Sequence, residues 1–102
     1  MKYPENAPIA CGLDDLKERE QAWSAVIGAA LRTRTATEAG IRLEFDPKPD
    51  AAHVLLDLVT AERDCCAWAT WTLTSTDGAT VVEASAAEPG PEVLHAMFRL
   101  EP

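Results

Sequence analysis

The sequence lacks any long hydrophobic run. No apolar stretch approaches the roughly 18 to 20 residues that a membrane-spanning helix needs. Residues 1–10 also lack the charged and apolar regions of a signal peptide. We therefore predict a cytoplasmic protein that is not inserted in a membrane.

Basic residues are few. The chain has 9 Lys and Arg against 17 Asp and Glu, which gives a formal net charge of −8. Because no cluster of Lys and Arg offsets this charge locally, electrostatics oppose binding to nucleic acid or to an anionic membrane. The charge instead favours a cation or a basic protein surface as the partner. A homodimer is a further alternative.

Cysteine is scarce as well. The three cysteines are an odd number, and Cys65 and Cys66 are adjacent, which is not how a secreted disulfide framework is laid out. Neighbouring helical residues point about 100° apart, so these two do not form a relaxed disulfide with each other. We expect free thiols in a reducing compartment.

A chain of 102 residues with 47% hydrophobic residues fits one domain with a modest core. We assign residues 1–102 to this domain, with residues 1–8 as an extended N-terminal arm. The patterns predict, in order, a strand at 9–13, helix at 15–34, strand at 41–45, helix from 50, strands near 71–74 and 82–84, and a last helix near Pro91. This order, β-α-β-α-β-β-α, predicts an α+β two-layer sandwich with helices on one face of a mixed four-stranded sheet.

The expected ends of the helices depend on single residues. Asp15 and Glu18 have capping-box spacing at the start of the first helix. Threonines at 33, 35 and 37 weaken the helix and Gly40 offers a left-handed stop, so we predict that it ends between Thr33 and Gly40. Asp50 follows a proline-containing turn and is the expected cap of the central helix.

A hairpin is expected late in the chain. Asp-Gly at 77–78 is typical of a two-residue hairpin turn between alternating apolar and polar residues. This turn sets the register, in which Leu73 faces Val82 and Trp71 faces Ala84 on the core side.

The central helix carries the residues of greatest chemical interest. Its inward face is predicted from steps of three and four: Val54, Leu55, Leu58, Val59, Glu62, Cys65, Cys66 and Ala69. Glu62 interrupts this apolar face, and a carboxylate there needs a cation, a hydrogen-bond donor or a metal. Ion pairing with Arg19 of the first helix, direct metal ligation and solvent exposure are the alternatives.

One carboxylate and two thiols on one helical turn suggest a site for a soft ion. We predict metal ligands at Glu62, Cys65 and Cys66, with Cys11 as a third thiolate reached across the sheet. Three thiolates suit Hg(II), Cu(I) or As(III) better than Mg or Ca. Structural zinc is not expected, because spaced cysteine pairs and a local histidine are missing.

Two other interpretations compete with the metal site. In the first, the cysteines are buried core residues, as free cysteines often are, and the protein is a non-catalytic interaction module. An enzymatic thiol is less favoured, because the last turns of a helix disfavour an anion and Glu62 and Asp64 raise a thiol pKa. We expect His53 and His95 at the surface, Trp23 and Trp71 in the core, and Trp68 at an interface only if it is exposed.

The run Glu62-Arg63-Asp64-Cys65-Cys66, followed by Trp68 and Trp71, resembles small uncharacterised E-R-x-C-C proteins of actinobacteria. Ile9-Ala10-Cys11, ahead of a helix with Trp23, also matches them. These proteins occur beside or fused to MerR-type heavy-metal regulators. The resemblance implies a link to metal or metalloid stress, with Cys11, Glu62, Cys65 and Cys66 as the matching positions. It implies no known activity, and a regulator's DNA-binding segment is missing.

Overall fold

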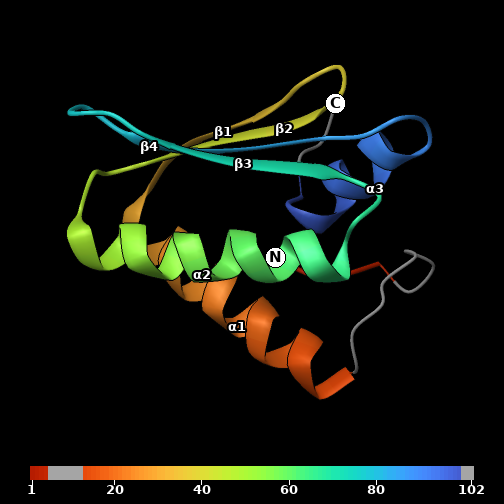
Figure 1. The fold of residues 1–102 in the computed structure, drawn as a ribbon, viewed down its shortest axis with the longest axis horizontal. Helices are drawn as coiled ribbons and strands as arrows, with labels where there is room; N and C mark the ends of the chain where they lie inside the picture. Colours follow the sequence, from red (N-terminus) through yellow and green to blue (C-terminus); the bar gives the residue numbers. More distant parts are fainter. Residues whose placement is uncertain (5–12, 100–102) are drawn as a thin grey trace.

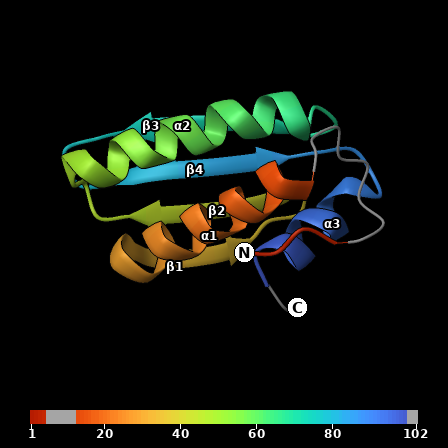
Figure 2. The same cartoon turned by 90° about the horizontal axis from the view of Figure 1, so that it is seen from below.

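The computed structural model describes residues 1–4 and 13–99. Its helices and strands follow one another in the order α-β-β-α-β-β-α (Figure 1). The elements are α1 (Leu13–Ala30), β1 (Leu31–Ala36), β2 (Gly40–Phe45), α2 (Pro49–Cys65), β3 (Thr70–Ser75), β4 (Thr80–Ser85) and α3 (Gly90–Met97). The helices lie on one side of a four-stranded sheet (Figures 1 and 2). The predicted α+β fold class is confirmed.

The sheet has the order β1-β2-β4-β3, and all neighbouring strands are antiparallel. The prediction of a mixed sheet is therefore wrong. In the hairpin of β3 and β4, Leu73 pairs with Val82 and Trp71 with Ala84, as the turn at 77–78 predicts. The alternation of core and solvent side chains favours this register, because a slip of one residue would turn every core side chain to the other face.

The first strand is not where the sequence predicts it. Helix α1 ends at Ala30, and residues 31–36 form β1, although the expected helix continued to residue 34. Threonine at 33 and 35 fits a strand, and β1 gains backbone hydrogen bonds by pairing with β2. The expected strand at 9–13 lies mostly outside the described residues, and Leu13 belongs to α1.

Gly40 has a different role from the predicted one. None of the described glycines has a positive φ, so Gly40 does not end a helix in the left-handed region. A Cβ at this position would lie 1.9 Å from the carbonyl oxygen of Ala84 on β4. Gly40 is needed because the backbones of β2 and β4 approach too closely for a side chain.

Helix α2 begins earlier than expected, with its N-cap two residues before Asp50. Lys48 is at its N-cap, Pro49 is its first residue, and no side chain caps its N-terminus. Asp50 lies in the first turn and is not the cap, because the fixed φ of Pro49 already starts the helix. In α3, Pro91 occupies an early position, as predicted.

The core lies between the helices and the sheet. The rings of Trp23, Trp71 and Phe98 pack together, with centroids 5.2 to 6.4 Å apart. Both predicted core tryptophans are confirmed, and Trp68 is half-buried against the same core.

None of the helices in the described ranges is long and apolar enough to cross a membrane.

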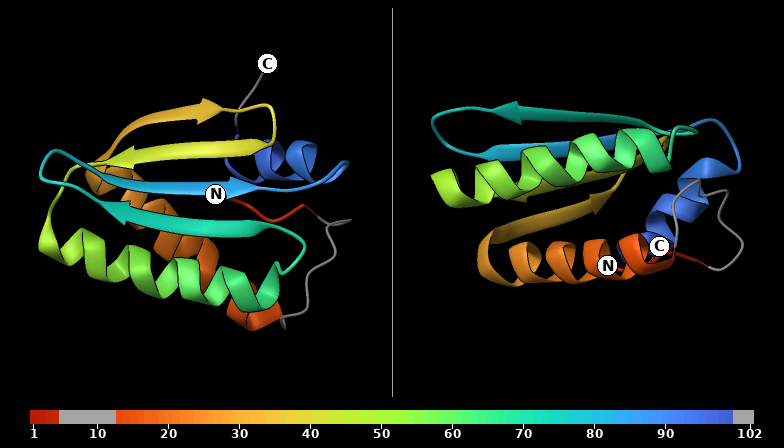
Figure 3. Two further views of the ribbon diagram at one scale, coloured as in Figure 1. Left: turned by 45° about the horizontal axis from the view of Figure 1, so that its top comes forward. Right: turned by 60° about the horizontal axis from the view of Figure 1, so that its bottom comes forward.

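Residues 1–4 run alongside α3 in both views of Figure 3. The backbone N–H of Lys2 donates to the carbonyl of Met97 at 2.9 Å, and that of Tyr3 donates to Glu20 at 2.8 Å. These bonds tie residues 1–4 to α1 and to the end of α3. Tyr3 is thereby directed into the core, where it is 8% exposed.

Candidate functional site

The candidate site is the last turn of α2, where Glu62 and Cys65 are buried and Cys66 caps the helix. The N–H of Cys66 donates to the carbonyl of Glu62 at 2.7 Å, which closes the last turn. The predicted inward face is confirmed from Leu55 onward, but Val54 is 39% exposed and does not belong to the core. The helix thus places three of the four predicted ligands at one end of the core.

Glu62 is fully buried and is held by two donors. Its Oε1 accepts hydrogen bonds from the hydroxyl of Tyr3 at 2.5 Å and from Nη1 of Arg19 at 2.6 Å. The ion pair with Arg19, one of the three alternatives from the sequence, is therefore confirmed. Solvent exposure of Glu62 is excluded.

The second oxygen of this carboxylate is not used. Glu62 Oε2 is buried and has no hydrogen-bond partner among the described residues, and the same holds for the indole N–H of Trp23. Trp23 is nevertheless close enough to help hold down the pKa of Glu62. Native proteins satisfy nearly all buried polar groups, so this oxygen can still accept one hydrogen bond or bind one cation.

Burial raises the pKa of Glu62, while the hydrogen bonds from Tyr3 and Arg19 and the charge of Arg19 oppose the rise. With a guanidinium 2.6 Å away, the ionised form is satisfied on one oxygen. Burial beside this carboxylate also raises the pKa of the Tyr3 hydroxyl, which stays a donor at neutral pH.

The two adjacent cysteines differ. Cys65 is 3% exposed and takes part in a disulfide, whereas Cys66 is a fully buried free thiol. The expectation of free thiols is thus wrong for Cys65, and the expectation that the neighbours do not pair with each other is confirmed. Burial, and then the negative charge of Glu62, raises the pKa of the Cys66 thiol to about 12, against the smaller opposing effect of Arg19.

The fourth predicted ligand, Cys11, lies outside the described residues. Within residues 1–4 and 13–99, no three His, Cys, Asp or Glu side chains are grouped so that they could hold a metal ion. Of the predicted ligands, Glu62 and Cys66 interact, since the carboxylate raises the pKa of the thiol.

Sequence reasoning missed Tyr3 and misjudged one histidine. The sequence pattern places Tyr3 in an extended arm, and the only signal for a role is that it is the single tyrosine of the chain. His53 is exposed as predicted. His95 is half-buried, with Nε2 2.7 Å from the carbonyl oxygen of Gly40 and 3.1 Å from that of Thr37, so this nitrogen carries the proton.

No protein-family model matches the chain, and neither a curated protein nor a solved structure shows significant similarity to it.

Proposed function

We propose that the protein binds a soft heavy-metal or metalloid ion through the thiols at the end of α2 once the disulfide of Cys65 is reduced. Hg(II), Cu(I) and As(III) are the candidate ions, because thiolates prefer soft ions. The role is sequestration or sensing. A reducing cytoplasm would supply the reduction on which binding depends.

The observation that carries this proposal is the unused oxygen of Glu62 next to a buried free thiol. A buried acceptor without a partner costs about 1 to 3 kcal/mol. A cation held by the thiolates would give Glu62 Oε2 a partner and remove that cost. The likeness of the Glu62–Cys66 run to proteins found beside heavy-metal regulators supports the same conclusion.

Each residue has a distinct part in this proposal. Cys66 is the first ligand, because it is a free thiol already beside Glu62. Reduced Cys65 is the second, although it points about 100° away around the helix, so the last turn has to adjust on binding. The participation of Cys11 stays a prediction from the sequence.

Titration of the reduced protein with Hg(II), followed by thiolate-to-metal absorption, tests the proposal. We expect saturable binding that weakens at least about tenfold in Cys66→Ser and about tenfold in Glu62→Gln. His53→Ala changes an exposed side chain and is the matched control, with unchanged affinity expected. Equal affinity of the wild type and Cys66→Ser would contradict the proposal, as would tight binding that does not require reduction.

A second candidate function is a non-catalytic interaction module in which the cysteines only pack. The complete burial of Cys66 in the core cluster favours it. In that case Cys66→Ala lowers the free energy of unfolding by about 1 kcal/mol, as small core truncations do, and the reduced wild type has no affinity for Hg(II). Tight binding of Hg(II) by the reduced wild type excludes this candidate.

A further inference from the structure

A groove of about 580 Å³ lies between α1 and α2, far from the cysteines. Its α2 wall is residues 48–54, at the start of the helix, whereas Cys65 and Cys66 are at the end. At 1.5 Å per residue, the two places are about 20 Å apart along the helix axis. The groove is therefore independent of the proposed metal site.

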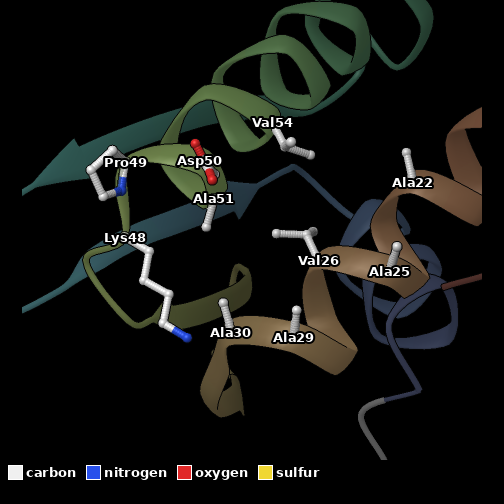
Figure 4. Close-up of a pocket in the computed structure, with 10 residues that line it drawn as sticks. All are labelled: Ala22, Ala25, Val26, Ala29, Ala30, Lys48, Pro49, Asp50, Ala51 and Val54. Carbon is white, nitrogen blue, oxygen red and sulfur yellow. The ribbon is translucent and has the colours of Figure 1, made fainter.

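Small apolar side chains line most of the groove (Figure 4). From α1 come four alanines and Val26, and from the first turns of α2 come Pro49, Ala51 and Val54. Alanines on facing positions leave space that larger side chains would fill. Ala25 and Ala29 are exposed, so no other described residue covers this part of the groove.

Two charged residues, Lys48 and Asp50, complete the lining at one end. Lys48 is exposed and forms no salt bridge with another described residue. It stands at the N-cap of α2, where the helix dipole is also positive. The carboxylate of Asp50 partly offsets this positive end.

We propose that the groove binds a small amphipathic carboxylate, with its apolar chain against Ala25, Val26 and Val54 and its carboxylate paired with Lys48. The volume and the mostly apolar lining with few polar groups match small-molecule sites, which measure about 300 to 1,000 Å³. The net charge of −8 does not prevent this pairing, because salt screens charges beyond about 8 Å.

The surface around the groove is too poor in large apolar residues for a stable protein interface. Among the described residues, the only exposed large hydrophobics are Val54 and Leu56, and Leu56 does not line the groove. A standard interface buries about 800 Å² per partner around a core of large side chains. This favours a small molecule over a second copy of the chain.

Titration of the folded protein with decanoate, followed by NMR of the alanine methyl groups, tests the proposal. We expect saturable shifts of the Ala25 and Ala29 signals. Decan-1-ol, which has the same chain but no charge, should bind about threefold to fivefold more weakly, the factor expected for one exposed ion pair.

Three variants sharpen the test. Ala25→Phe fills the groove from an exposed position and should raise the Kd for decanoate at least about tenfold, as loss of apolar burial predicts. Lys48→Gln should raise the Kd about threefold to fivefold, and Asp50→Asn should lower it by a similar factor. Ala96→Phe, at an exposed position on α3, is the matched control and should bind as the wild type does.

The proposal is overturned if wild-type protein shows no saturable shift, or if Ala25→Phe, shown to be folded by its NMR spectrum, binds decanoate like the wild type. Equal affinity for decanoate and decan-1-ol, with no effect of Lys48→Gln, overturns the pairing with Lys48. A dimer in sedimentation that Ala25→Phe abolishes would assign the groove to a second copy of the chain and also overturn the proposal.

Discussion

Among single residues, Arg19 and Glu62 form a charge pair unlike the other pairs in the described ranges. Their side chains are 9% and 0% exposed, whereas Arg42 and Glu83, whose pair has a similar distance of 2.9 Å, are 42% and 51% exposed. Water screens the surface pair and leaves it worth little, whereas a buried charge depends on its partner. The Arg19–Glu62 pair is therefore the more sensitive to substitution.

Substituting Arg19 by methionine should lower the free energy of unfolding by about 3 kcal/mol or more, because Glu62 stays buried without its cation. The double variant Arg19→Met/Glu62→Leu should recover most of this loss, since an apolar pair needs no compensation. Urea unfolding measures both effects. Arg42→Ala, the surface control, should cost less than about 1 kcal/mol, and an equally small loss in Arg19→Met would contradict the argument.

At the scale of secondary structure elements, the pairing of β2 with β4 holds the two halves of the chain together. These strands are central in the sheet order, and each belongs to a different antiparallel hairpin. Gly40 starts β2 against Ser85, beside the carbonyl oxygen of Ala84. The close approach there leaves no space for a methyl group.

We predict that Gly40→Ala lowers the free energy of unfolding by about 3 kcal/mol or more, because the backbone of β4 must move away from the new Cβ. Gly78→Ala in the hairpin turn is the control. No atom lies within 4 Å of a Cβ at this position and its φ is not positive, so its effect should stay below about 1 kcal/mol. Thermal unfolding of both variants measures these changes in the free energy of unfolding. Similar decreases in Gly40→Ala and Gly78→Ala would contradict the steric explanation.

For the molecule as a whole, the buried titratable groups couple global stability to pH. The pKa of the Cys66 thiol rises from about 9 in an unfolded chain to about 12 in the fold. Between these values the unfolded chain releases a proton that the folded protein keeps. The stability that this group contributes is therefore complete below about pH 9 and is lost as the pH rises toward about 12.

The free energy of unfolding of the oxidised protein should fall by up to about 1.4 kcal/mol per pH unit above about pH 9. Cys66→Ala should remove this part of the slope. Measurements between about pH 9 and pH 10 report mainly on the thiol, because Tyr3, whose pKa is also raised, reaches its full contribution to the slope only above about pH 10. Equal slopes in the wild type and Cys66→Ala would contradict the raised pKa.

The sequence by itself determined the local features of this protein. The alternating apolar and polar residues on both sides of Asp-Gly at 77–78 specified the hairpin and its register, because only one register puts the apolar side chains on the core face. The period of α2 placed Leu58, Glu62 and Cys65 on its buried face, since the helical repeat depends on the chain alone. Matching positions on α1 and α2 also suggested the pair of Arg19 with Glu62.

Only the tertiary structure decided what depends on contacts between distant segments. Residues 31–36 became a strand because β2 was available to pair with them, and Gly40 proved necessary because Ala84 lies against it. Tyr3 reaches Glu62 across 59 positions of sequence, a contact that no local pattern encodes. The surroundings that keep the Cys66 thiol protonated arise in the same way, because burial and neighbouring charge exist only after the chain has folded.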